Sequence, residues 1–127
     1  MKIASLIAGI LLGIIFLVFG LNGFLHFIPM PPPSGVAGQF LGSLFVSHYL
    51  VVIFLLQVIP AILLLANRYV PLALTLLGPI VVNILLFHAL MEPGGLPLAF
   101  VVAMLWCITA YIVRPAFAGI FQQRVPA

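Results

Sequence analysis

Apolar residues occur in four long runs that are separated by short polar or proline-rich breaks. The runs cover residues 3–25, 46–66, 70–91 and 97–117. A helix needs about 20 apolar residues to cross the hydrocarbon core of a bilayer, and each run is close to this length. The pattern therefore predicts an all-α membrane protein with a single domain, residues 1–127, in which four transmembrane helices form an antiparallel bundle.

The first break is longer than the others. Residues 27–38 contain four prolines and two glycines, which predicts a non-helical loop. A helical pattern returns at residues 37–45, too far from the end of the second span to belong wholly to it. These residues are either an extension of that span or, as we prefer, a short interfacial or re-entrant helix that covers one end of the bundle.

The first run begins directly after Lys2 and so resembles a signal peptide. It is longer than the ~7–15 residues of a signal-peptide core, and no A-x-A cleavage site follows it. We therefore interpret it as a retained span.

The composition agrees with a protein of the bilayer. Hydrophobic residues make up 66% of the chain and charged residues 4%, whereas a soluble domain carries about 25% charged residues. The net charge of +3 comes from so few residues that it predicts no surface for nucleic acid. A single cysteine, Cys107, excludes an intramolecular disulfide and a CxxC redox pair.

The few charges predict the orientation of the spans. With four spans, the basic residues Lys2, Arg68, Arg114 and Arg124 all fall on one side of the membrane, and Glu92 falls on the other. Basic residues concentrate on the cytoplasmic side of membrane proteins. Both termini are therefore expected in the cytoplasm.

Polar side chains of the spans gather toward the outer side. These candidate site residues are Asn22, His26, His48, Asn83, His88 and Glu92. Because polar groups are costly inside hydrocarbon, they mark either a functional site or hydrogen bonds between helices. We interpret them as a polar pocket roofed by the proline-rich loop. The alternative is a set of interfacial side chains that reach water.

Spacing refines this pocket. His88 and Glu92 are four residues apart and would share one helix face, whereas Asn83 lies about 140° around the helix from His88. Gln57, near the middle of the second span, is interpreted as a partner in a hydrogen bond between helices, and the alternative is that it lines a pathway.

Two further sites remain open alternatives. His26, His48, His88 and Glu92 have the chemistry of zinc or iron ligands, although no two histidines are spaced as an i, i+4 pair. A haem held by two histidines of facing helices is the second alternative.

Two segments, FGLNGFLHFIPMPPP at residues 19–33 and NRYVPLALTLLGPIVVNILLFHALMEPGG at residues 67–95, resemble the DoxX-like family of small bacterial membrane proteins. The resemblance implies a four-helix bundle in the bacterial inner membrane. It also implies a link to membrane-bound redox chemistry, because the family is named after a subunit of a thiosulfate:quinone oxidoreductase.

The resemblance extends to individual residues. Asn22, His26, Asn83 and His88 match the family pattern and are carried over as the site. Similar proteins often have a Lys and a Glu in the second span, where this chain has Phe54 and Gln57. A mechanism that needs an ionisable pair at this depth is therefore not expected.

These observations predict a subunit of a larger, redox-linked membrane complex that binds a quinone or lipid in the outer pocket. We assign no catalytic residue and no metal site, and expect a larger membrane-protein partner; a homo-oligomer stays open. One alternative is a stand-alone quinone-linked oxidoreductase with a metal or haem at the histidines. The other is a small oligomeric transporter, with Pro60 and Pro79 marking broken helices.

Overall fold

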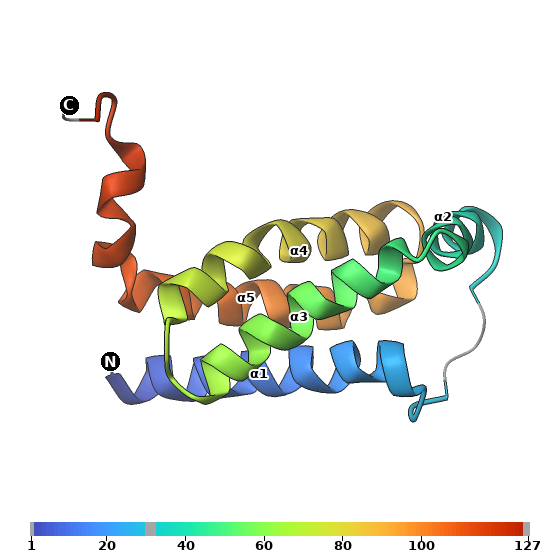
Figure 1. The fold of residues 1–127 in the computed structure, drawn as a ribbon, viewed down its shortest axis with the longest axis horizontal. Coiled ribbons are helices and arrows are strands. Elements are labelled where there is room, and N and C mark those ends of the chain that lie inside the picture. The colour runs from blue at the N-terminus through green and yellow to red at the C-terminus, as the bar shows by residue number, and fades with distance from the viewer. Residues whose placement is uncertain (1, 30–32, 126–127) are drawn as a thin grey trace.

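The computed structural model describes residues 2–29 and 33–125, and all regular structure within them is helical. Four long helices lie side by side in Figure 1: α1 (Lys2–Leu25), α3 (Tyr49–Leu65), α4 (Val70–Leu90) and α5 (Leu96–Ile112). The shorter elements are α2 (Gly35–Val46), which precedes α3, and the 3₁₀ segments η1 (Pro93–Gly95) and η2 (Arg114–Phe121), which flank α5.

Three of these helical segments are long and apolar enough to cross a membrane, namely α1, α4, and α5 together with η1. A fourth candidate is the pair α2 and α3, which is bent by 89°. Helix α3 alone has 17 residues and is about 25 Å long, slightly less than a hydrocarbon core of about 30 Å. The chain is thus an all-helical protein with three or four candidate spans, as its apolar runs indicate.

Glycines allow α1 to approach α3 closely. A Cβ added at Gly13 would come within 3.1 Å of the Ala61 carbonyl oxygen, and one added at Gly23 would overlap the Phe54 ring. Helix α1 also packs on α5, and α4 packs on both α3 and α5. Small residues that bring helix backbones together are typical of membrane helices.

The core lies between the four long helices. It includes the fully buried Leu12, Leu74 and Leu77, and the indole N–H of Trp106 joins α5 to α4 by donating to the Leu74 carbonyl at 3.0 Å. Many large apolar side chains point outward instead; Phe100, for example, is 59% exposed. An outer surface of this kind suits contact with lipid rather than water.

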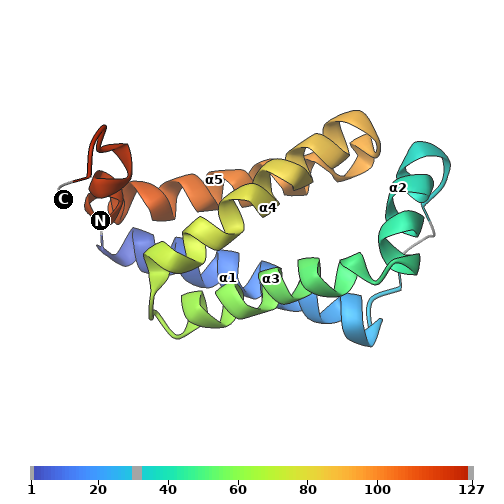
Figure 2. The same ribbon diagram turned by 45° about the horizontal axis from the view of Figure 1, so that its top comes forward.

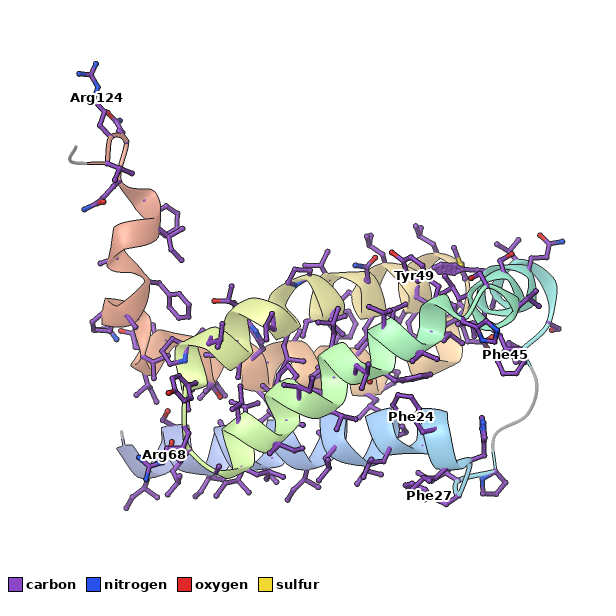
Figure 3. The ribbon with its side chains drawn as sticks, in the orientation of Figure 1. Phe24, Phe27, Phe45, Tyr49, Arg68 and Arg124 are labelled. Atoms are coloured by element: carbon purple, nitrogen blue, oxygen red, sulfur yellow. The ribbon has the colours of Figure 1, made fainter. Side chains whose placement is uncertain are left out.

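The two ends of the molecule differ. At the end where α2 lies, α1 and α4 finish and α3 and α5 begin; this is called the α2 end (Figure 1). Arg68 and Arg124 lie at the opposite end (Figure 3). Figure 2 shows that α1 and α3 diverge from α4 and α5 toward the α2 end.

Several element boundaries differ from the sequence-based expectation. Helix α2 begins at Gly35, inside the expected loop 27–38, whose residues 30–32 lie outside the described residues. Helix α5 ends at Ile112 rather than near residue 117, and η2 turns away from the bundle (Figure 1). Pro115 explains this early end, because proline lacks an N–H and disfavours helical backbone in the residue before it.

The two internal prolines do not break their helices. Pro60 lies within a continuous α3 and Pro79 within a continuous α4. The broken helices invoked by the transporter alternative are therefore not present at these positions. The break between α2 and α3 falls instead at Ser47 and His48.

Candidate functional site

A cavity of about 1250 Å³ opens at the α2 end, where the two pairs of long helices diverge. All five α-helices contribute to its walls, which are mainly aliphatic and aromatic. The polar side chains that line it are Asn22, His26, His48, Tyr49, Gln57, Asn83 and His88. No Lys, Arg, Asp or Glu lines it among residues 2–29 and 33–125. The cavity is therefore large, apolar and uncharged, with a few polar groups.

Five of the six candidate site residues meet at this cavity. The structure brings together Asn22, His26, His48, Asn83 and His88 in the lining of one cavity. Glu92 is exposed and does not line the cavity. The individual roles of these residues follow from local geometry.

Asn22 stabilises the end of α1. Its backbone carbonyl accepts the N–H of His26 at 2.8 Å, and its Oδ1 accepts the N–H of Ile28 at 2.7 Å. The side chain is 9% exposed. These bonds satisfy backbone groups that a helix end leaves without partners, so Asn22 has a structural role in addition to lining the cavity.

His26 and His48 both have left-handed backbone conformations, with φ of 54° and 64°. Histidine adopts this region more readily than most residues other than glycine. His26 directly follows α1, where a left-handed residue commonly ends a helix. His48 joins α2 to α3 at the 89° bend. Both rings are exposed, so each residue also turns the chain at the cavity mouth.

The His88 ring is held by the turn that follows α4. Its Nδ1 lies 3.0 Å from the carbonyl oxygen of Glu92. Because a carbonyl can only accept a hydrogen bond, Nδ1 carries a proton, and in this tautomer Nε2 is the acceptor. A Cβ at Gly95 would overlap the ring, so Gly95 provides the space that the ring occupies.

The expectation that His88 and Glu92 share a helix face is wrong. Helix α4 ends at Leu90, and Glu92 has a non-helical backbone with φ of −142°. The carboxylate therefore does not follow the helical rotation from His88. Glu92 contributes its backbone carbonyl to the site instead of its charge.

Asn83 lies at an edge of the cavity, because its side chain lines the cavity and is also exposed. Its Nδ2 donates to the carbonyl of Pro79, one turn earlier in α4, at 2.8 Å. The donor is thus used within its own helix, and Oδ1 remains as an acceptor.

Gln57 has a different environment from the one its sequence position predicts. The side chain is 9% exposed, lines the cavity and makes no hydrogen bond to the described residues. The expected hydrogen bond from Gln57 to a neighbouring helix is therefore absent among the described residues. An isolated amide in an apolar run indicates depth in the membrane, but the run cannot show whether a neighbouring helix offers a partner.

Helix α2 covers the mouth of the cavity. Its Phe40, Leu41, Leu44 and Phe45 line the cavity, and the Phe40 ring lies 6.0 Å from the ring of Phe87 on α4. The sequence predicts that the proline-rich loop covers the cavity. Of that loop, residues 28–29 line the cavity, and residues 30–32 lie outside the described residues. The roof is thus mainly a helix.

The metal and haem alternatives gain no support from the placement of the histidines. No three His, Cys, Asp or Glu side chains of the described residues are grouped so that they could hold a metal ion. His26 and His48 lie in connections, and only His88 lies within a helix, so no two histidines face each other from packed helices.

Comparisons of the chain with protein-family models, with curated proteins and with solved structures found no match. The site is therefore interpreted from its own geometry. The fold and the cavity define an all-helical protein with several candidate membrane spans and a large, uncharged cavity at one end.

Proposed function

We propose that the chain is a membrane subunit of a larger, redox-linked complex, and that it binds a quinone or lipid in the cavity at the α2 end. The observation that carries this proposal is the cavity itself, with its apolar walls and its few amides and imidazoles. Apolar pockets with a small number of placed polar groups are typical binding sites for small amphipathic molecules.

The proposal includes a topology of four antiparallel spans, with α2 and α3 together supplying the second. The α2 end faces the outside of a bacterial inner membrane, and both termini lie in the cytoplasm. The arginines at the opposite end support this orientation. Arg114 fits an interfacial position, since its guanidinium lies 4.1 Å over the Tyr111 ring and donates to the Tyr111 carbonyl.

The chain is proposed to depend on a partner for catalysis. The cavity lining contains no Ser, Thr, Cys, Lys or carboxylate among the described residues, so the groups able to move protons there are imidazoles and the Tyr49 hydroxyl. Cys107 is exposed on α5, away from the lining. The resemblance to DoxX-like proteins supports the redox link.

Native mass spectrometry of gently solubilised native membranes tests this function. We expect a larger partner protein in fixed stoichiometry with the chain and a quinone or neutral lipid bound to it. In the double variant Asn83→Leu, His88→Leu we expect the bound molecule to decrease about tenfold, since the acceptors Asn83 Oδ1 and His88 Nε2, which suit a hydroxyl of a quinol or an acylglycerol, are lost. Gln39→Leu, which removes an exposed amide outside the cavity, serves as the control.

Two results would contradict the proposal. The first is a chain that is recovered alone or as a homo-oligomer, with an empty cavity. The second is unchanged occupancy and unchanged quinone-linked electron transfer in the double variant.

A further inference from the structure

Gln57 lies deep in the cavity. It is eight residues after Tyr49, the first residue of α3, which places it about 12 Å from the α2 end of that helix. The histidines that line the cavity are at or near the ends of α1, α3 and α4. Gln57 is therefore close to the floor and the histidines are close to the mouth.

The amide of Gln57 is available to a ligand. Among the described residues, every fully buried side-chain N or O atom has a hydrogen-bond partner. The amide of Gln57 has no such partner, so its N and O atoms are not fully buried. Its polar atoms must consequently touch open space, and the residue lines the cavity at this end. An amide in such apolar surroundings is costly unless a partner fills this space.

Asn22 provides a second amide at a similar depth. Helix α1 contacts α3 at this level, because a Cβ at Gly20 would lie 3.3 Å from the Cβ of Gln57. Asn22 follows Gly20 by two residues and is also 9% exposed. Its Oδ1 is occupied by the N–H of Ile28, whereas its Nδ2 has no partner among the described residues.

We infer that the Gln57 amide forms a subsite at the floor of the cavity, with the Asn22 amide about 3 Å nearer the mouth, and that these donors bind carbonyl oxygens of an uncharged amphiphile that enters head first. This inference rests on the proposed function, in which the cavity holds such a molecule. Asn22 Nδ2 and Gln57 Nε2 are donors that a carbonyl oxygen satisfies, and Gln57 Oε1 is an acceptor that suits a hydroxyl.

The absence of charge in the lining indicates an uncharged head group. Among the described residues, no Lys or Arg lines the cavity to neutralise a phosphate and no Asp or Glu to neutralise an amine, and the three histidines lie near the mouth rather than the floor. A quinone ring and the ester of an acylglycerol share the required chemistry, a carbonyl attached to an apolar body. The apolar walls of the cavity then surround the rest of the molecule.

Titration of the purified full-length chain, followed by native mass spectrometry, tests the subsite. The probes are decylubiquinone, dioctanoylglycerol and the anionic dioctanoyl phosphatidylglycerol. We expect at least one neutral probe to bind, and the anionic probe to bind at least tenfold more weakly. Binding of decylubiquinone alone, or of dioctanoylglycerol alone, supports the subsite and identifies the source of the carbonyl.

Three variants separate a role in binding from a role in folding. Gln57→Leu should lower the affinity for the neutral probe about tenfold. Asn22→Asp retains the acceptor for the Ile28 N–H but loses the Nδ2 donor, so it should also lower this affinity. Gln39→Leu is the matched control at an exposed position and should bind as the native chain does. If Gln57→Leu does not fold, Gln57→Met replaces it, with a similar length and no amide.

Thermal unfolding without ligand supplies a second readout. Gln57→Leu removes no hydrogen bond within the described residues, so its unfolding temperature should equal or exceed that of the native chain. A clear decrease would indicate a structural role for Gln57 and overturn the subsite.

The remaining outcomes distinguish the two proposals. If no probe binds the native chain, the proposed function fails and the subsite fails with it. If a neutral probe binds equally to the native chain, Gln57→Leu and Asn22→Asp, the subsite is wrong but the proposed function stands. If the anionic probe binds as tightly as a neutral one, the inference of an uncharged head is wrong.

Discussion

His88 owes its position to the backbone of the η1 turn. The Glu92 carbonyl accepts a hydrogen bond from Nδ1–H of the His88 ring. The missing Cβ of Gly95 leaves room for this ring. The φ of Gly95 is −92°, which other residues also adopt, so glycine is needed here for space rather than for conformation. Gly94 is its neighbour in the same turn, and a Cβ there would meet nothing within 4 Å.

This difference predicts unequal effects of two alanine substitutions. Gly95→Ala should displace the His88 ring and destabilise the fold by about 1–2 kcal/mol, as overpacking commonly does. Gly94→Ala should have little effect. Nitrogen NMR of labelled histidine would show loss of the Nδ1-protonated tautomer in Gly95→Ala, and denaturant unfolding would show the change in stability. Equal spectra and stabilities for the two variants would contradict this arrangement.

The sequence predicts where along a span a single polar residue lies, but not which group it forms a hydrogen bond with. The apolar runs place Asn22 and Gln57 within spans, yet nothing in the runs shows that Asn22 Oδ1 caps the chain after α1 while Gln57 lacks a partner. Glu92 illustrates the same limit, because the i, i+4 argument assumes a helix that in fact ends at Leu90. Partners depend on tertiary placement, which spacing alone does not determine.

At the scale of elements, α2 differs most from its expectation. A short helix near residues 37–45 follows from the sequence, but its 89° angle to α3 depends on the left-handed backbone of His48, which no local pattern indicates. In contrast, the early end of α5 could have been predicted from Pro115. The position of α2 matters for the proposed function, because its residues line the mouth of the cavity.

Chemical cross-linking tests whether α2 lies against α4. In a Cys107→Ser background, Phe40→Cys and Phe87→Cys should be joined in high yield by a short bismaleimide, because the two native rings are 6.0 Å apart. The pair Phe40→Cys and Phe121→Cys should give little product within one chain, since η2 and α2 lie at opposite ends (Figure 1). Similar yields from both pairs would indicate that α2 does not occupy this position.

At the scale of the whole molecule, Arg68 and Arg124 lie at the opposite end from the cavity. Arg68 and Arg124 are found at one end, while Phe45 and Tyr49 mark the other (Figure 3). The four apolar runs suffice to predict this arrangement, because bilayer thickness sets the length of each span. The cavity is not predictable in this way, since it results from the divergence of α1 and α3 from α4 and α5.

The proposed orientation predicts which side of the membrane each end faces. In a Cys107→Ser background, Ser34→Cys lies next to α2 and Gln122→Cys lies beyond η2, and both native positions are exposed. A membrane-impermeant maleimide added to intact spheroplasts should label Ser34→Cys fully and Gln122→Cys only after permeabilisation. Because both positions are exposed in the fold, a difference in labelling reports sidedness rather than burial. The reverse pattern would place the cavity on the cytoplasmic side, and its ligand would then have to be sought there.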